Sequence, residues 1–253
     1  MKKKILTAAA LTFALGFGGA AQAAPAEDIP SRDFSFDGIF GTFDYASAQR
    51  GLQVLEQACM ACHSMELVPF YTLEGIGYTE EEVLAIAEQY NVEDGPDDRG
   101  NMFERPGRAT DTIPDPYPNE QAARAANQGA YPPDLSVITK AREGGPEYLY
   151  ALLTGYTDPP PGVEVGGGLF WNEHYSGNQI AMPPPLTDGM VDYQDGTEAT
   201  VSQMSHDVTM FLHFAAEPHM EARKRMGIKV ILFLIVFTGL LYAVKRRIWQ
   251  DLH

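Results

Sequence analysis

The clearest candidate for a reactive site in this sequence is the segment Cys59-Met60-Ala61-Cys62-His63. They have the C-x-x-C-H form in which a c-type haem is attached covalently. On a helix the two cysteines share a face, and the histidine lies one turn on from the first of them. Both thiols can then add to haem vinyl groups while the imidazole takes an axial position on the iron. This motif predicts one covalently bound haem c with His63 as an iron ligand.

A zinc site or a thiol redox site could use the same C-x-x-C spacing. Cys59 and Cys62 are the only cysteines of the chain. A zinc site would need two further ligands at matching spacing, and a thioredoxin-like site would need a βαβ context that the surrounding sequence does not offer. If both thiols hold a haem, no structural disulfide can form.

An iron bound by His63 has one axial position left. Met182 is the leading candidate, because the prolines at 183–185 stiffen the backbone beside its sulfur. His174 is the main alternative, and the other candidates are His206, His213 and His219. A thioether raises the haem potential relative to a second imidazole. A six-coordinate iron has no open position for a substrate, so this ligand set predicts electron transfer.

Arginine side chains are natural partners of haem propionates. The candidates are Arg99, Arg105, Arg108, Arg124 and Arg142. Residue types and spacing alone do not choose among them.

Apolar spacing and capping residues predict a mainly α domain. Helices are expected at 44–62, 79–89, 121–127, 147–154 and 201–215. The segments 91–118 and 157–190 are rich in Gly and Pro and are expected to be loops. Strand patterning is weak throughout. A long ordered loop such as 157–190 is usually functional, and here it could wrap a cofactor.

Both ends of the chain carry apolar segments. The first 23 residues have the pattern of a secretory signal peptide. Three lysines are followed by an apolar run and by the small-residue cleavage pattern Ala21-Gln22-Ala23. The run 226–244 is long enough to span a bilayer at about 1.5 Å per residue. We therefore expect an inner-membrane protein with a single span, its main domain periplasmic and its C-terminus cytoplasmic.

The charge of the chain is concentrated between these two ends. The whole sequence carries −16, while 1–23 and 226–253 each carry +3, which leaves −22 on 24–225. Such a field repels nucleic acid and would steer a basic partner. The acids at Glu80, Glu81 and Glu82 also suit the start of a helix, so this triplet does not by itself indicate a docking patch.

At this point the chain resembles the cytochrome c1 family, the haem subunit of ubiquinol:cytochrome c reductase, in its alphaproteobacterial form. The resemblance covers nearly all of the chain after residue 24 and depends on the order and spacing of many short matches. They are residues 36–43, Cys59–His63, 125–136, 141–148, 152–156, 180–186, 195–197, 215–218 and 225–227.

The resemblance implies a class I cytochrome c-like haem domain with long loops and one C-terminal transmembrane helix. It divides the chain into a signal peptide at 1–23, a periplasmic domain at 24–222, an anchor with its flanks at 223–247 and a cytoplasmic tail at 248–253. Met182 matches the axial methionine of the family. Further matches, which line the haem, are Asn127, Pro133, Tyr148 and Arg142, the last near a propionate. Some bacterial members brace the loop before that methionine with a cysteine pair, which this chain lacks.

The implied function is single-electron relay in the respiratory or photosynthetic bc1 complex, and not enzyme activity by this chain alone. The expected partners are cytochrome b, a Rieske iron–sulfur protein as donor and a basic c-type cytochrome as acceptor. Two alternatives stay open. One is a tethered c-type cytochrome that feeds a terminal oxidase, and the other is a haem enzyme or gas sensor with an open iron position.

Overall fold

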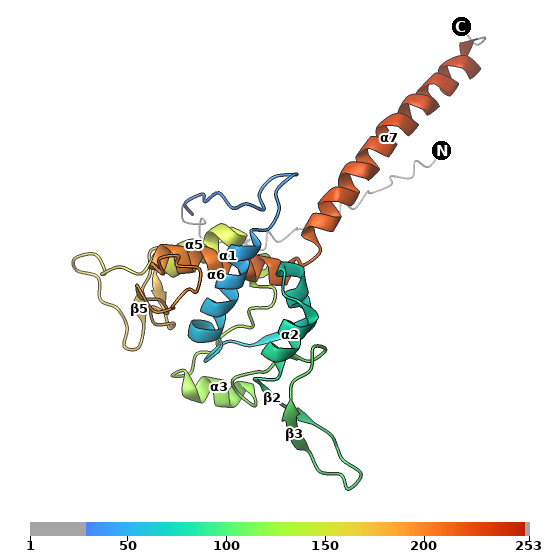
Figure 1. The fold of residues 1–253 in the computed structure, drawn as a ribbon. Coiled ribbons are helices and arrows are strands. Elements are labelled where there is room, and N and C mark those ends of the chain that lie inside the picture. Colours follow the sequence, from blue (N-terminus) through green and yellow to red (C-terminus); the bar gives the residue numbers. More distant parts are fainter. Residues whose placement is uncertain (1–28, 251–253) are drawn as a thin grey trace, which may run out of the picture.

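The chain folds into a mainly helical domain from which one long C-terminal helix projects (Figure 1). The structure is a computed structural model that describes residues 29–250, so the expected signal peptide at 1–23 and the last three residues of the tail lie outside it. The helices are α1 (Tyr45–Val54), α2 (Glu80–Ala87), α3 (Glu120–Ala126), α4 (Ile138–Ala141), α5 (Gly145–Thr154), α6 (Val201–Ala216) and α7 (Met220–Ile248). The prediction of a mainly α fold is confirmed.

Short strands form three antiparallel pairs in the described residues. They are β1 (Met65–Pro69) with β4 (Thr112–Ile113), β2 (Asn91–Asp94) with β3 (Phe103–Pro106), and β5 (Phe170–Trp171) with β6 (Gln179–Ile180). The expectation that 91–118 is entirely loop is therefore wrong. The β2–β3 hairpin is polar and gives no apolar alternation. It is braced by Arg105, which forms ion pairs with Asp94 and Asp111.

The core is centred on the contact between α1 and α6. Gly51 of α1 allows this close approach, because a Cβ atom there would lie 1.9 Å from the carbonyl oxygen of Asp207. The apolar stripe predicted on 201–215 faces this contact, and its fully buried members include Met204, Val208 and Phe211. The packing fixes the direction of α1, whose chain continues into the C-x-x-C-H motif.

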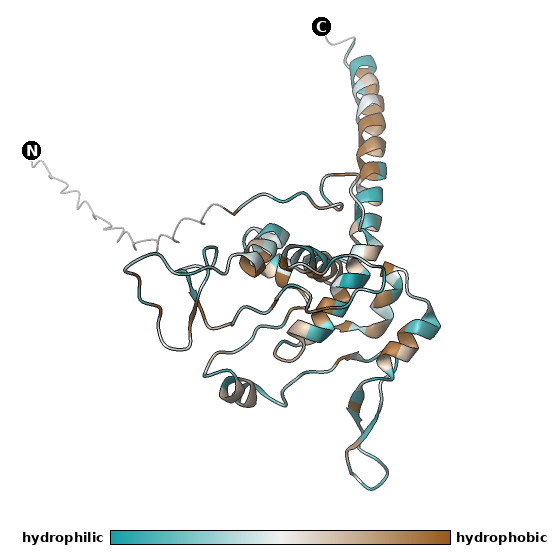
Figure 2. Cartoon of the chain, turned by 60° about the vertical axis from the view of Figure 1, so that its left-hand side comes forward, coloured by the Kyte–Doolittle hydropathy of each residue, from teal (hydrophilic) through white to brown (hydrophobic). Residues whose placement is uncertain are grey.

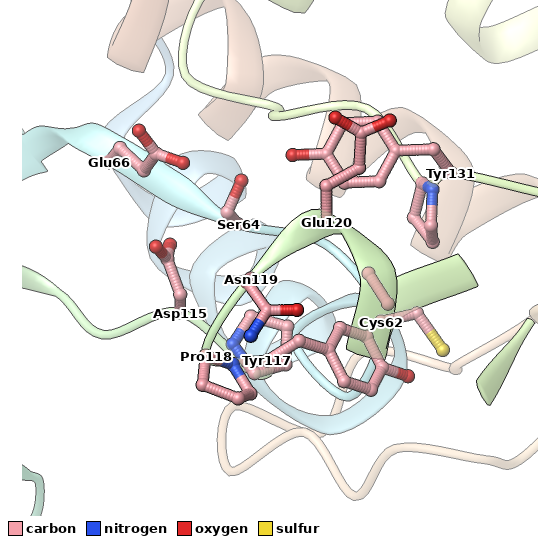
Figure 3. Close-up of a pocket in the computed structure, with 12 residues that line it drawn as sticks. Cys62, Ser64, Glu66, Asp115, Tyr117, Pro118, Asn119, Glu120 and Tyr131 are labelled. Carbon is pink, nitrogen blue, oxygen red and sulfur yellow. The ribbon is translucent and has the colours of Figure 1, made fainter. Parts of the chain in front are cut away.

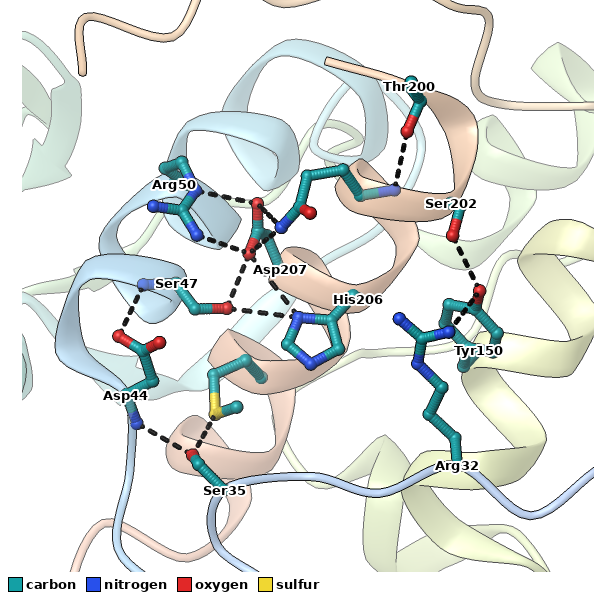
Figure 4. Close-up of polar contacts among 12 residues, drawn as sticks. Arg32, Ser35, Asp44, Ser47, Arg50, Tyr150, Thr200, Ser202, His206 and Asp207 are labelled. Carbon is teal, nitrogen blue, oxygen red and sulfur yellow. Dashed lines mark hydrogen bonds and ion pairs between the residues drawn. The ribbon is translucent and has the colours of Figure 1, made fainter. Parts of the chain in front are cut away.

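A buried ion pair reinforces the same contact (Figure 4). Asp207 has no exposed side-chain surface, and the Nε and Nη2 atoms of Arg50 donate to its carboxylate at 2.9 and 3.1 Å. The Ser47 hydroxyl donates to it at 2.5 Å. Burial alone would raise the pKa of Asp207, but hydrogen bonds from His206, Arg50, Ser47 and Gln203 outweigh burial and lower it to about 2. The carboxylate is thus held ionised inside the domain.

The helix predicted over 44–62 is interrupted before the motif. Regular α-helix ends at Val54, and a π-helical turn follows at Leu55–Cys59. The chain then leaves the helix in a tight turn that contains Cys62. A π-helical turn widens the helix by one residue and is frequent at functional sites. Apolar spacing does not reveal it, because the buried residues Val54 and Leu55 lie on both sides of the change.

Helix α7 is long and apolar enough to cross a membrane, by its length and composition. Its apolar stretch has no cover within the described residues (Figure 1). The first residue, Met220, is buried in the domain with 2% of its surface exposed. The helix therefore begins inside the folded domain and continues outward without a break.

Candidate functional site

One turn of backbone brings together the three functional side chains of the C-x-x-C-H motif. The Cys62 and His63 amides both donate to the carbonyl of Cys59, at 3.1 and 2.9 Å. The Met60 amide donates to the Leu55 carbonyl at 3.0 Å. These bonds join the π-helical turn to the turn after it, so the two thiols and the imidazole have a common rigid base.

The imidazole of His63 is fixed by a second segment of the chain. Its Nδ1 atom lies 2.7 Å from the carbonyl oxygen of Pro133. Burial lowers the pKa of His63, although the hydrogen bond with Pro133 opposes this. A neutral ring that donates from Nδ1 to this carbonyl keeps the Nε2 lone pair free for a metal. Pro133, one of the site residues implied by the resemblance, thus contacts the expected iron ligand.

The two cysteines form no disulfide with each other, and their surroundings differ from those of a redox site. Burial, with a smaller effect of Cys62, raises the pKa of Cys59 to about 12. Reactive redox cysteines instead have a lowered pKa and a stable thiolate. Within residues 29–250, no group of three or more His, Cys, Asp or Glu side chains is arranged to hold a metal ion. The redox and zinc interpretations are both disfavoured.

A pocket opens beside Cys62 (Figure 3). Its lining includes Tyr117 and Tyr131. The side-chain amide of Asn127 donates to the Tyr117 hydroxyl at 3.2 Å and to the Ala123 carbonyl at 2.8 Å. Asn127 therefore orients an aromatic ring of this pocket. Tyr117 was not predicted from the sequence, and no local motif marks it.

Four carboxylates lie at the edge of this pocket or directly next to it. Glu120 is paired with Arg124, and we call the other three, Glu66, Asp115 and Asp134, the acidic rim. Asp134 accepts from the Ser64 hydroxyl and the Glu66 amide, each at 2.9 Å. The charge of Asp115 raises the pKa of Glu66, and burial together with Asp134 raises that of Asp115. Negative charge is thus concentrated in space beside the pocket that Cys62 lines. The sequence does not show this cluster, because its members are far apart along the chain.

Met182 lies on a segment that is braced on both sides. Ile180 before it and Leu186 after it are buried. The hydroxyl of Tyr156 donates to the Met182 carbonyl at 3.1 Å. With the prolines at 183–185, these contacts restrict where the thioether can point. Tyr156 is a site residue that sequence reasoning missed, although it falls within the resembling stretch 152–156.

Asn172 braces the long loop that precedes Met182. It is fully buried, and its side-chain amide donates to the Leu152 carbonyl at 2.8 Å. Its side-chain oxygen accepts from the amides of His174 and Tyr175 at 3.0 and 3.1 Å. This one side chain replaces part of what a disulfide would supply in the loop. The Gly166 amide adds a further contact within the loop, since it donates to the side-chain oxygen of Gln179 at 2.9 Å.

Of the five candidate arginines, three have guanidinium groups within ion-pair distance of a carboxylate. Arg105 bridges Asp94 and Asp111, and Arg124 pairs with Glu120. The Nη1 atom of Arg108 lies 4.0 Å from the Oδ2 atom of Asp94. No ion pair involves Arg99 or Arg142 within the part of the chain that the structure describes.

Arg142 directly follows α4, whereas Arg99 lies in the exposed turn between β2 and β3. Burial raises the pKa of Tyr148, and the neighbouring charge of Arg142 opposes this. Burial and Tyr148 in turn raise the pKa of Tyr156. The charge of Arg142 thus acts on Tyr148, Tyr148 acts on Tyr156, and Tyr156 contacts the Met182 backbone.

The long loop connects these residues with the Asn127 side of the site. A Cβ atom on Gly168 would lie 2.5 Å from the side-chain oxygen of Gln128, so the loop rests on the turn that follows Asn127. The donor set fits a c-type haem: two thiols and an imidazole come from one turn, Nε2 of His63 can face a metal, and the Met182 thioether lies on a braced segment. The Arg142 guanidinium donates to the Ala141 carbonyl at 3.2 Å and has no carboxylate partner in residues 29–250.

The fold and the site together define a mainly helical domain with a single C-x-x-C-H site and a C-terminal helix of membrane-spanning length. The chain belongs to the cytochrome c1 family, because the sequence model of that family, described as "Cytochrome C1 family", matches residues 34–252.

Individual relatives agree with this assignment. The chain is 52% identical to "Cytochrome c1-2, heme protein, mitochondrial" of Solanum tuberosum over 94% of this chain and 93% of that protein. It is 43% identical to "Cytochrome c1" of Rhodospirillum rubrum over 98% and 97% of the two chains. It is 48% identical to "Cytochrome b/c1" of Bradyrhizobium diazoefficiens over 88% of this chain and 36% of that longer protein.

Proposed function

We propose that this chain is a membrane-anchored c-type cytochrome that relays single electrons. One haem c is bound through Cys59 and Cys62, with His63 and Met182 as axial ligands. The observation that carries this proposal is the geometry of the motif: both thiols and the imidazole share one turn, and Nδ1 of His63 is 2.7 Å from the Pro133 carbonyl. When bound, the haem supplies reversible one-electron oxidation and reduction.

The residues of the chain have separate roles in this function. The Pro133 carbonyl holds the orientation of His63 and makes its Nε2 atom a stronger electron-pair donor to iron. Tyr156 and Asn172 restrict the loop of Met182, so that the thioether keeps its place. Arg142 has no carboxylate partner in the described residues, so its guanidinium can pair a propionate, and Asn127 and Tyr148 complete the lining.

The partners follow from family membership. The chain acts in the bc1 complex, ubiquinol:cytochrome c reductase, with cytochrome b, and it takes electrons from a Rieske iron–sulfur protein. The name of the Bradyrhizobium relative, which joins b and c1, supports an association with cytochrome b. The acidic rim beside Cys62 favours a basic c-type cytochrome as acceptor, because opposite charges steer encounter. The haem domain is periplasmic and the tail is cytoplasmic, as the signal peptide pattern at 1–23 indicates.

The first experiment tests haem attachment. The full chain is produced in a host with c-type haem maturation, purified in mild detergent, unfolded and analysed by mass spectrometry. We expect the mass of one haem to stay with the unfolded chain. The Cys62→Ser variant should shift the pyridine haemochrome band in the direction expected for a single thioether bond. A haem-free chain whose two thiols both react with an alkylating reagent would contradict the proposal.

The second experiment separates the partners. Co-purification with a Rieske protein and cytochrome b is expected, whereas a terminal oxidase without a Rieske protein would favour the alternative relay. Addition of carbon monoxide to the reduced protein should leave its spectrum unchanged, because a firm sixth ligand blocks the iron. A ligand-induced spectral change would favour a haem enzyme or gas sensor.

A further inference from the structure

An apolar tip stands out on the segment that precedes α1. Phe40 is 79% exposed, which is the largest exposed fraction of any large apolar side chain in the described residues, and its neighbour Ile39 is 66% exposed. We call these two residues the apolar tip. Scattered single apolar residues on a surface are ordinary, but two adjacent ones at the end of a loop need a reason.

The loop that carries the apolar tip is rigid at its base. Phe36 and Phe43, on the two sides of the tip, are buried at 4% and 8% exposure. The Thr42 amide donates to the Ser35 carbonyl at 3.0 Å and so joins the two ends of the loop. A Cβ atom on Gly41 would lie 2.1 Å from the Asp37 carbonyl oxygen, so the turn is tight enough to require glycine there. Because both sides are fixed, Ile39 and Phe40 cannot turn inward without breaking this base.

Hydrogen bonds attach the same loop to the start of α7. The ammonium group of Lys224 donates to the carbonyls of Phe36 and Gly41, the latter at 3.2 Å. The Phe43 amide donates to a carboxylate oxygen of Glu221 at 3.0 Å. Lys224 lies only two residues before the apolar run of the helix, a rise of about 3 Å. Figure 2 shows the segment beside the first turns of α7, next to the apolar span.

Basic side chains surround this level of the helix. Arg225 and Lys229 are exposed, and in residues 29–250 neither forms an ion pair. An aromatic and aliphatic tip next to unpaired basic groups is the composition of a contact with the headgroup region of a bilayer. The rest of the domain is strongly acidic, so this end differs in charge from the surface around the acidic rim.

We propose that the apolar tip, Ile39 and Phe40, inserts into the headgroup region of the leaflet on the haem-domain side. It thereby gives the domain a second point of contact with the membrane. This inference rests on the proposed membrane anchoring by α7. Two contacts, one through the helix and one through the loop, fix the tilt of the domain, whereas a single helix would leave the domain free to rotate over the membrane. A fixed tilt keeps the acidic rim presented to a soluble partner.

The test uses the haem-loaded full chain in lipid vesicles, alone and in complex with its partner subunits. Phe40→Cys receives a thiol-reactive nitroxide, and collision with oxygen is compared with collision with a water-soluble nickel chelate. The matched control is Leu67→Cys, which is 66% exposed on β1 near the acidic rim. A label at Val236→Cys, in the middle of the span, reports on the anchoring itself. Wild-type protein should take up no label, because both of its cysteines hold haem.

We expect the label at position 40 to meet oxygen several-fold more than the nickel chelate, with the opposite order at position 67. Preference for nickel at position 40 would show water and overturn the proposal. Shielding from both reagents in the assembled complex would show that a protein partner covers the tip, which also overturns it. If the label at position 236 reports water, the anchoring has failed instead, and uptake of label by the wild type would indicate that the haem assignment has failed.

Discussion

Met182 shows how a single residue can set a property of the whole protein. Replacement by Leu keeps a similar volume but removes the sulfur, so covalent haem should remain while the reduction potential falls, because the thioether no longer stabilises the reduced iron. Redox titration followed by optical spectroscopy measures this change. Met190→Leu, on the same loop and 42% exposed, is the matched control and should leave the potential unchanged.

The alternative ligand is tested in the same assay. If His174 is the sixth ligand, His174→Ala will shift the potential and Met182→Leu will not. The structure gives His174 a different role at the backbone level, where its amide donates to Asn172. We therefore expect the haem spectrum of His174→Ala to match that of the wild type.

Asp207 determines the acid stability of the domain. Its pKa is lowered from the usual 3.8 to about 2 in the fold, so its contribution is present above pH 4 and is lost as pH falls through 2. Asp207→Asn leaves Arg50 without its buried counter-charge and should cost about 3 kcal/mol of unfolding free energy at pH 7. The variant should also lose part of the pH dependence between 4 and 2. Chemical unfolding monitored by circular dichroism at several pH values measures both effects.

The control for this prediction is Asp195→Asn, which removes the other carboxylate bound to Arg50 at 2.8 Å. Asp195 is half exposed, and water screens its charge. Asp195→Asn should therefore lower the unfolding free energy much less than Asp207→Asn does. Equal losses for the two variants would contradict the view that burial of Asp207 makes this ion pair important.

At the scale of elements, the long loop between α5 and α6 depends on one buried amide. Asn172→Ala leaves the Leu152 carbonyl and two backbone amides without partners, which should destabilise the loop by about 2 kcal/mol. Hydrogen exchange should then speed up at 172–182 but not in α1 or α6. Asn101→Ala, in the exposed turn between β2 and β3, is the control and should change little. Unchanged exchange at 172–182 would show that other contacts hold the loop.

At the scale of the whole molecule, the excess negative charge has two candidate centres. The acids at the start of α2 are explained locally, since Thr79 and Glu82 form a capping box and Glu82 accepts from the Thr79 amide at 2.8 Å. In the acidic rim Asp134 has a structural role, since it accepts from the Ser64 hydroxyl and the Glu66 amide, but Glu66 and Asp115 cap no helix. We therefore expect Glu66→Gln with Asp115→Asn to slow electron transfer to a basic cytochrome by about 10-fold at low salt.

Glu80→Gln with Glu81→Gln removes the same number of charges and is the matched control. Stopped-flow measurement at several ionic strengths gives the salt dependence of each rate. The rim variant should flatten this dependence, while the control keeps most of it. A steep slope that survives the rim variant would place the docking patch elsewhere, and a flat slope in the wild type would reject steering.

The features that depend on local spacing could be predicted from the sequence. The C-x-x-C-H motif, the helices near 80–87, 120–126, 145–154 and 201–216, and the long apolar C-terminal helix are all set by residues close together in the chain. Helical periodicity and capping are local properties, so these elements could be predicted. The family could also be recognised, since it depends on the order of many short matches.

The features that join distant segments could be seen only in the folded chain. The π-helical turn before Cys59, the contact of His63 with Pro133, the brace made by Asn172 and the acidic rim each involve the packing of segments that carry no shared pattern. Of the candidate arginines, Arg105 and Arg124 are bound to carboxylates, whereas Arg142 has no carboxylate partner in residues 29–250 and its charge acts on Tyr148. The physical reason is common to all of these: a hydrogen bond or ion pair between remote residues depends on where the backbone brings them, and periodicity holds no information on that.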